Sequence, residues 1–419
     1  MRIGRSVAAG LLWGWLCIAL AAQIPQVAFL TQAPAPGSGH DYIRGLVDTV
    51  NPANGQLSLR FGVPLPWGRG LALPFGVDYS SSGVFFPAPE GMGSPGYADP
   101  KTPAAGWYSS DGWMYSLPRV SNDAGTATDD YGGTCNYTND YVFYDPSGGA
   151  TNLSVGRATE GTSINTDYPC SSTGMSTVTQ AQNGPWFTDL DAGTVTGVDG
   201  TLYNINAFLY STAVVARDRN GNEVSMTGGS NGQFSYIDTL GRTVLAVSGF
   251  DNPNTSQVDT LAVSGLSQPY RLVWRQVSYG FSSTFDLLGT DAQCSQGPVG
   301  TSGTLDAVSE VDLPNGQSFQ LSYAVPSGAS SYATITKITT PGGATISYTW
   351  GIEADADYTS LNWQGADPNA DSGPTYWNFN CEYHYGAPVV TDRSVSLDGT
   401  HEILHQHFDY SVNWGSGAG

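Results

Sequence analysis

The sequence predicts an all-β protein in which consecutive antiparallel β-hairpins form a curved, repeat-like sheet behind an N-terminal β-module. Apolar residues recur at every second position, as at Leu57, Leu59 and Phe61, and this alternation is typical of a strand with one buried face. No segment of about 12 residues carries apolar residues at helical spacing. The 53 glycines and 25 prolines among 419 residues indicate short strands joined by tight turns.

The chain begins with a segment typical of a secretory signal peptide. Arg2 and Arg5 precede an apolar stretch, residues 7–21, that ends in small residues, so we predict a signal peptide over 1–21 and a secreted or cell-surface protein. The stretch is shorter than the roughly 20 residues that span a bilayer, so no membrane insertion is expected after cleavage. Residues 22–45 predict a flexible leader, 46–118 an N-terminal β-module, and 119–419 a hairpin array with loop insertions.

Short dipeptides between the alternating segments predict hairpin turns. Asn220-Gly221 favours two successive positive φ angles, which are the signature of a type I′ turn. The same arrangement recurs at Asn315-Gly316, Gly342-Gly343 and Asp398-Gly399.

An internal repeat accompanies these turns. Asp218 and Asp238 are 20 residues apart, and each stands three residues before a glycine, Gly221 or Gly241, with Arg242 following the second. One such hairpin cannot bury its own apolar face, so neighbouring units must pair laterally into a long sheet.

The cysteines predict disulfides. Once the signal peptide is removed, Cys135, Cys170, Cys294 and Cys381 remain, and an even number in an oxidising compartment indicates two bridges. Proximity along the chain favours Cys135–Cys170 and Cys294–Cys381, but all three possible pairings stay open. The spacings match no zinc finger or zinc ribbon.

The charge balance excludes two classes of partner. The formal net charge is −21, only 12% of residues are charged, and Lys101 and Lys337 are the only lysines. Neither a basic patch nor a basic amphipathic helix can be drawn from such a sequence. We therefore expect no binding to nucleic acid or to an anionic membrane surface.

Several motifs, taken in order, resemble the N-terminal region of RHS/YD-repeat secreted proteins. They are VNPANGQLSLRFGVPLPWGRGLALPFGVDYSSS at 50–82, GWMYSLPRV at 112–120, YVFYDPSGG at 141–149, the YD-like DRNGN and YIDTLGRTV, and the Pro-Gly hairpins after Leu313 and Thr340. The resemblance implies an extracellular shell of spiralling β-hairpins, which in bacteria encloses or delivers a C-terminal toxin or sits on the cell surface. It implies further YD repeats or a C-terminal cargo of the same polypeptide as partners. The self-cleaving core and the toxin segment of the family have no counterpart in this sequence.

One pentapeptide spells a metalloprotease motif. His401, Glu402 and His405 match the pattern H-E-x-x-H, in which a helix brings two imidazoles to one zinc ion. Here the motif follows a Gly turn, and the residues after it alternate, which places Leu404, Phe408, Tyr410 and Val412 on one face and His405, His407 and Asp409 on the other. We therefore predict a solvent-facing strand instead of a zinc site, with at most weak chelation by His405 and His407.

Three further patterns have structural explanations that we prefer to chemical ones. The sequence GGSNG around Ser230 matches the nucleophile elbow of hydrolases, but a strand pattern follows it where a helix is required. Asp189 and Asp191 could form a glycosidase-like carboxylate pair, although a solvated turn explains them. Oxygen-bearing residues at alternate positions in DPNADSG, residues 367–373, and at Asp218, Asn220 and Asn222 suit a structural calcium ion, and no other cofactor is expected.

Aromatic residues, 12% of the chain, leave two functional hypotheses open. We expect most of them to fill the sheet core, which favours a non-catalytic structural or encapsulating module with no catalytic residue and no metal ligand. Exposed tryptophans, for which Trp107, Trp113 and Trp377 are the candidates, would instead favour a module that binds a cell-surface carbohydrate or receptor. A secreted hydrolase is the third and weakest hypothesis.

Overall fold

The computed structural model describes most of the chain from residue 47 onward. The described residues are 47–66, 71, 73–81, 109–110, 112–128, 134–160, 177–180, 186–207, 212–230, 232–250, 258–283, 285–288, 299–324, 331–366 and 376–411. The expected signal peptide and leader lie outside these ranges. Every described secondary-structure element is a β-strand, which confirms the predicted all-β class. The described residues contain no helix long and apolar enough to cross a bilayer.

The N-terminal module is a five-stranded antiparallel sheet in the order β1-β2-β3-β5-β4. Its strands are β1 (Asp48–Val50), β2 (Leu57–Val63), β3 (Phe75–Ser80), β4 (Ser109–Ser110) and β5 (Trp113–Tyr115). Strand β2 alternates as predicted, because Leu57, Leu59, Phe61 and Val63 are buried.

A second, four-stranded sheet follows, in which β7 pairs with β6, β8 and β9. Its strands are β6 (Arg119–Thr128), β7 (Thr134–Tyr144), β8 (Ala150–Asn152) and β9 (Arg157–Glu160). The chain passes from the first sheet to the second between β5 and β6.

The remaining strands belong to one long antiparallel sheet of 17 strands. Each strand from β10 to β19 pairs with the next, β19 pairs with β21, and each strand from β21 to β26 again pairs with the next. Strand β20 pairs with the part of β25 that β26 leaves free. The strands are β10 (Val178–Gln180), β11 (Trp186–Asp189), β12 (Thr194–Gly197), β13 (Leu202–Asn204), β14 (Thr212–Arg217), β15 (Glu223–Ser230), β16 (Gln233–Asp238), β17 (Thr243–Ser248), β18 (Asp259–Val263), β19 (Tyr270–Ser283), β20 (Phe285–Leu288), β21 (Val299–Asp312), β22 (Ser318–Tyr323), β23 (Ile335–Thr339), β24 (Thr345–Ala366), β25 (Tyr376–Ser396) and β26 (Glu402–His407).

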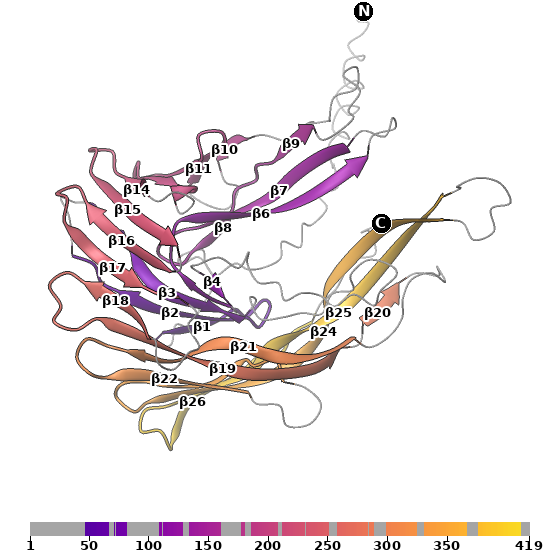
Figure 1. Ribbon diagram of the computed structural model, residues 1–419. Coiled ribbons are helices and arrows are strands. Elements are labelled where there is room, and N and C mark those ends of the chain that lie inside the picture. Colours follow the sequence, from indigo (N-terminus) through magenta and orange to yellow (C-terminus); the bar gives the residue numbers. More distant parts are fainter. Residues whose placement is uncertain are drawn as a thin grey trace, which may run out of the picture.

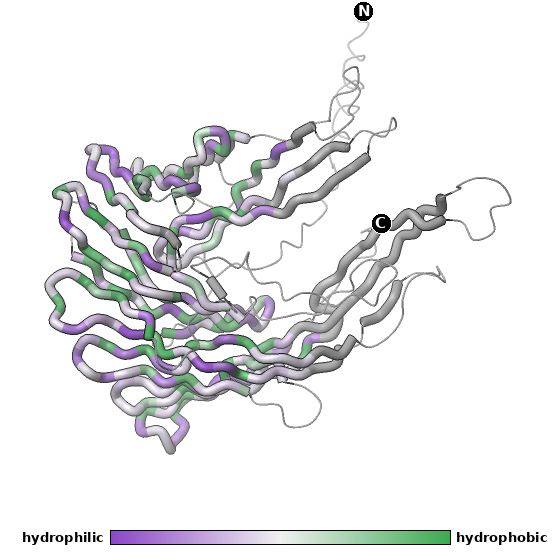
Figure 2. The backbone as a smooth tube through the Cα atoms, viewed as in Figure 1, coloured by the Kyte–Doolittle hydropathy of each residue, from purple (hydrophilic) through white to green (hydrophobic). Residues whose placement is uncertain are grey.

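The long sheet curves around the N-terminal sheet (Figure 1). The four-stranded sheet lies at the end of the curve that holds β10 to β15. Along the tube of Figure 2, hydrophobic and hydrophilic residues alternate on the strands, and hydrophilic residues gather at the hairpin tips. This is the consecutive-hairpin architecture that the alternating sequence predicts.

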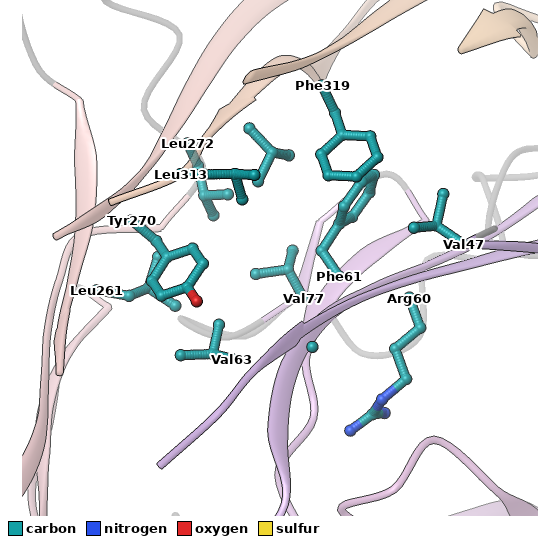
Figure 3. A pocket seen from close by; sticks show the side chains of 12 residues that line it. Val47, Arg60, Phe61, Val63, Val77, Leu261, Tyr270, Leu272, Leu313 and Phe319 are labelled. Atoms are coloured by element: carbon teal, nitrogen blue, oxygen red, sulfur yellow. The ribbon is translucent and has the colours of Figure 1, made fainter. Parts of the chain in front are cut away.

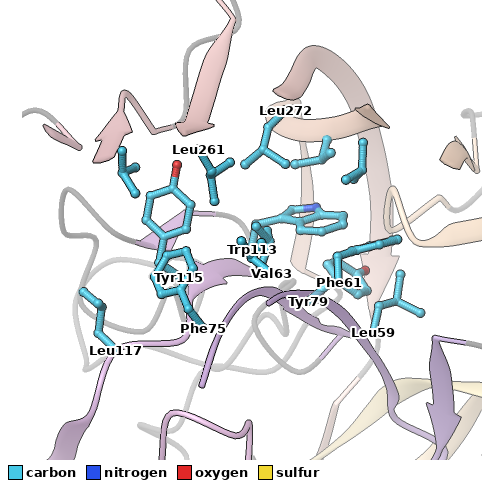
Figure 4. Close-up of a cluster of buried hydrophobic side chains, with 14 of the residues drawn as sticks. Leu59, Phe61, Val63, Phe75, Tyr79, Trp113, Tyr115, Leu117, Leu261 and Leu272 are labelled. Carbon is cyan, nitrogen blue, oxygen red and sulfur yellow. The ribbon is translucent and has the colours of Figure 1, made fainter. Parts of the chain in front are cut away.

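One hydrophobic core joins the N-terminal sheet to the long sheet. The rings of Trp113 and Trp274 lie 6.5 Å apart edge to face, and those of Phe61 and Phe319 lie 5.1 Å apart. Figure 4 shows side chains of the N-terminal sheet facing Leu261 and Leu272 of the long sheet. Residues of the N-terminal sheet therefore share their core with the hairpin array.

The hairpin turns share one geometry, which differs from the predicted type I′ turn. In the turn at Asp218, the Gly221 N–H donates to the Asp218 carbonyl (3.0 Å), and the Asp218 N–H donates to Asn222 (2.9 Å). Of the pair Asn220-Gly221, only Gly221 has a positive φ, +78°. This is a three-residue loop, a type I turn closed by a glycine in the left-handed region, which matches the strand twist as a type I′ turn would. The prediction of two positive φ angles was wrong.

The same pair of backbone hydrogen bonds recurs in six described turns. They span residues 145–149, 197–201, 218–222, 238–242, 313–317 and 340–344. The fourth position is always glycine with positive φ: Gly148, Gly200, Gly221, Gly241, Gly316 and Gly343. The aspartate that the repeat places three residues before a glycine is therefore the first residue in one version of a general five-residue turn.

Candidate functional site

The H-E-x-x-H residues do not lie on a helix. Residues 402–407 form strand β26, and the pairing of Asp392 with His407 fixes its register against β25. The His401 ring contacts Asp398 (Nδ1 to Oδ2, 2.6 Å), while His405 contacts Asp392 (Nε2 to Oδ1, 3.1 Å). The two imidazoles thus bind different carboxylates, and no group of three metal-ligating side chains occurs in the part of the chain that the structure describes. The strand prediction is confirmed.

His405 and His407 share one carboxylate on the outer face of the sheet. Besides the His405 contact, His407 Nδ1 lies 2.7 Å from Asp392 Oδ1. Glu402 lies 3.2 Å from His405, and Asp409 lies 3.3 Å from His407. The Asp392 hydrogen bonds raise the pKa of both histidines, and bonds from both rings lower the pKa of Asp392. The cluster is exposed, and it forms an acidic surface in which two weak bases are embedded.

The other patterns that suggested chemistry form turns. Strand β15 ends at Ser230, which pairs with Gln233 of β16, so the segment runs strand–turn–strand and lacks the helix of a nucleophile elbow. Asp189 Oδ1 accepts hydrogen bonds from the backbone N–H groups of Asp191 and Ala192. These two aspartates form a turn cap instead of a facing carboxylate pair.

Asp191 is engaged elsewhere. Its carboxylate pairs with Arg157 Nη2 (2.6 Å) and accepts a hydrogen bond from Thr177 (2.9 Å).

The aspartates of the repeat cap their own turns. The Asp218 carboxylate accepts hydrogen bonds from the N–H groups of Asn220 and Asn222 and from the Asn222 amide. These bonds, the Asn222 amide foremost, lower the pKa of Asp218. At the next turn Asp238 accepts from the backbone of Leu240 and Arg242 and pairs with the Arg242 guanidinium (2.6 Å). The oxygens proposed for calcium at Asp218 therefore already accept hydrogen bonds, and the second calcium candidate, residues 367–373, lies outside the described residues.

Trp113 was wrong as a candidate for sugar stacking. Its side chain is fully buried, and Figure 4 places it in the centre of the shared core. An indole enclosed in this way has no face free for a sugar ring. Trp107 and the side chain of Trp377 lie outside the described residues.

Among the side chains that the structure describes, Phe187 is the only exposed aromatic one, at 50%. The four cysteine side chains all lie outside the described set, so the disulfides stay a prediction.

A buried charged cluster, which the sequence did not reveal, ties the first strand to the last ones. Arg393 of β25 donates to both carboxylate oxygens of Asp48 in β1 (2.6 and 2.9 Å), and Tyr348 of β24 donates to Asp48 Oδ2 (2.7 Å). The Arg393 and Asp48 side chains are 1% and 0% exposed. Arg393 also donates to Gln406 of β26 (2.9 Å). Burial and the neighbouring Asp48 raise the pKa of Tyr348, so this hydroxyl remains a donor.

A second polar junction holds the other face of the N-terminal sheet. Arg60 pairs with both oxygens of Asp78 (3.1 and 3.0 Å) and donates to the Pro146 carbonyl (2.5 Å) in the turn after β7. Gly148 has a φ of +93°, and a Cβ there would lie 2.5 Å from Arg60 Nη1, so glycine lets the arginine reach the turn. Burial raises the pKa of Asp78 to about 6 despite the Arg60 charge.

An apolar cavity of about 160 Å³ lies between the two sheets that share the core. Its walls come from Phe61, Val63 and Val77 on one side and from Leu261, Leu272 and Phe319 on the other. In Figure 3 the Arg60 guanidinium points away from these apolar side chains. The walls of the cavity are therefore mainly apolar, with Arg60 and Tyr270 as the polar residues among them.

Fold and polar clusters together define an all-β scaffold of consecutive hairpins wrapped around an N-terminal sheet. Its polar clusters cap turns and join sheets. Comparisons with known protein families and with curated proteins found no match for this chain.

Proposed function

We propose that this chain is a non-catalytic structural module, a segment of an extracellular shell like those of the RHS/YD-repeat proteins that its motifs resemble. The observation that carries the proposal is the long sheet of hairpins, which pair in chain order and curve around the N-terminal sheet (Figure 1). A sheet that grows by one hairpin after another can enclose space without a separate domain.

The described polar clusters support a scaffold. Asp48 and Arg393 join strands 345 residues apart, and the Arg60–Asp78 pair joins the N-terminal sheet to the turn after β7. Aromatic side chains support it too, because Trp113, Tyr115 and Trp274 fill the core.

Electron microscopy of the natural secreted product tests this proposal. The expected particle is a hollow or deeply concave wall to which these residues contribute a curved segment. A compact particle without an internal space would contradict the encapsulating role. Turnover of protein or polysaccharide substrates that survives purification and is lost on changing Glu402 to Gln would contradict the non-catalytic role.

A further inference from the structure

The long sheet ends at β26 in an edge that no described strand covers. The N–H of Phe408 donates to the carbonyl of Thr391 (2.8 Å), so the pairs Arg393–Gln406 and Val395–Leu404, which are in the same register, exchange hydrogen bonds as well. His405 and His407 occupy the alternate positions. Their backbone N–H and C=O groups therefore point outward, away from β25, and no described backbone group pairs with them.

The side chains of this edge are exposed on both faces of the sheet. Leu404 lies on the core side, opposite Val395, yet it is 41% exposed, and the neighbouring Ile403 and Leu397 are 61% and 64% exposed. Gln406 is the one partly buried residue of β26, and the other five are exposed. An additional strand would cover Leu404 and extend the apolar layer by one row.

Natural sheets protect such edges with lysine, proline or a covering segment. Residues 402–407 contain neither lysine nor proline. A register shift between Val395 and Ser396 occurs only at the start of the strand. The edge thus keeps the geometry that an incoming strand requires.

The charge on the outer face defines the partner. Carboxylates of Asp392, Glu402 and Asp409 surround His405 and His407 at contact distances of 2.7 to 3.3 Å. Three carboxylates against two imidazoles leave a negative surface, and the chain as a whole carries a net charge of −21. A segment with basic side chains on one face and apolar side chains on the other complements both sides of this edge.

We propose that the outer edge of β26 is a docking site for an extended basic segment of a partner protein, which adds to the long sheet as a further strand. Its backbone pairs with His405 and His407, its apolar side chains cover Leu404, and its lysines or arginines meet the outer carboxylates.

Titration with a synthetic peptide tests this site. The probe is an N-acetylated, C-amidated heptapeptide in which lysine alternates with valine, and fluorescence anisotropy reports its binding. His405→Pro removes one outward N–H but no hydrogen bond to β25, so the variant should keep the fold while its affinity falls by about tenfold or more. His405→Ala is the matched control, because it removes the imidazole and keeps the N–H, and it should bind within about twofold of the parent.

A second peptide tests the same site on the unaltered protein, so that a folding defect in His405→Pro cannot be mistaken for a loss of binding. A peptide of the same sequence that is N-methylated on its pairing edge keeps the charge but cannot form the ladder, and it should bind the unaltered protein about tenfold more weakly. Equal affinity of the two peptides would reduce the interaction to charge alone and overturn the proposal. A dimer that forms in sedimentation experiments and disappears in His405→Pro would also overturn it, because a second copy would then be the occupant.

Discussion

At the scale of single residues, the Asp48–Arg393 pair makes the sharpest prediction. Replacing Arg393 by Met leaves the Asp48 carboxylate buried, with only Tyr348 as a partner. An uncompensated buried charge costs about 3–5 kcal/mol. We expect the free energy of unfolding, measured in urea, to fall by about this amount. Arg217→Met is the matched control, because Arg217 pairs with Glu223 (2.6 Å) but is 55% exposed, and it should cost less than about 1 kcal/mol. Equal losses in the two variants would show that Asp48 is solvated.

Asp78 gives a second prediction at this scale, the dependence of stability on pH. Its folded pKa of about 6 lies above its ordinary value of 3.8 because the carboxylate is largely withdrawn from solvent, with 17% of the side chain exposed. Protonation therefore favours the folded state, and this stabilising contribution is lost as the pH rises through about 6. Relative to Asp78→Asn, the parent protein should lose stability between pH 4.5 and pH 7.5 in urea titrations, an interval that spans this pKa of about 6. Parallel curves for the two proteins over that interval would contradict the assignment.

At the scale of elements, the five-residue turn predicts opposite outcomes for two adjacent glycines. Gly343 has a φ of +86°, Gly342 has no positive φ, and a Cβ added at either position would meet no atom within 4 Å. Steric space is therefore equal, and only the backbone conformation differs. Gly343→Ala should lower the free energy of unfolding by about 1–2 kcal/mol, while Gly342→Ala should be neutral or stabilise the protein by up to about 1 kcal/mol. Thermal unfolding of both variants decides this, and equal shifts would mean that the turn tolerates either conformation.

At the scale of elements, local features of the fold could be predicted from the sequence, whereas the turn type and the contacts between distant strands could not. Alternation at Leu57, Leu59 and Phe61 and the spacing of Asp218 from Gly221 are local signals, and they predicted the strand and the turn position. The turn type was missed because a dipeptide does not state the loop length, which the pairing of Asp218 with Asn222 sets. Asp48 and Arg393 could not be paired either, since alternation tells which face a side chain takes but not which distant strand lies opposite.

The same limit holds for the whole molecule, because the sequence predicted an N-terminal β-module over 46–118 but not how it packs against the array. The ring contacts of Trp113 with Trp274 and of Phe75 with Phe234, 6.5 and 5.9 Å between centroids, make the two sheets walls of one core. Elements that share one hydrophobic core tend to open together. A curved sheet gains rigidity from such a filled interior, so the N-terminal sheet acts as an internal support of the long sheet.

This shared core predicts how a defect spreads through the molecule. Trp113→Ala removes the fully buried indole and should cost about 3–5 kcal/mol. If β2 and β19 belong to one cooperative unit, amide hydrogen exchange in both strands should accelerate by the same factor, roughly two to four orders of magnitude. Phe187→Ala is the control, because its ring is 50% exposed and the change should stay within about 0.5 kcal/mol. Faster exchange confined to β1–β5, with β19 still protected, would mean that the N-terminal sheet opens alone and does not support the curved wall.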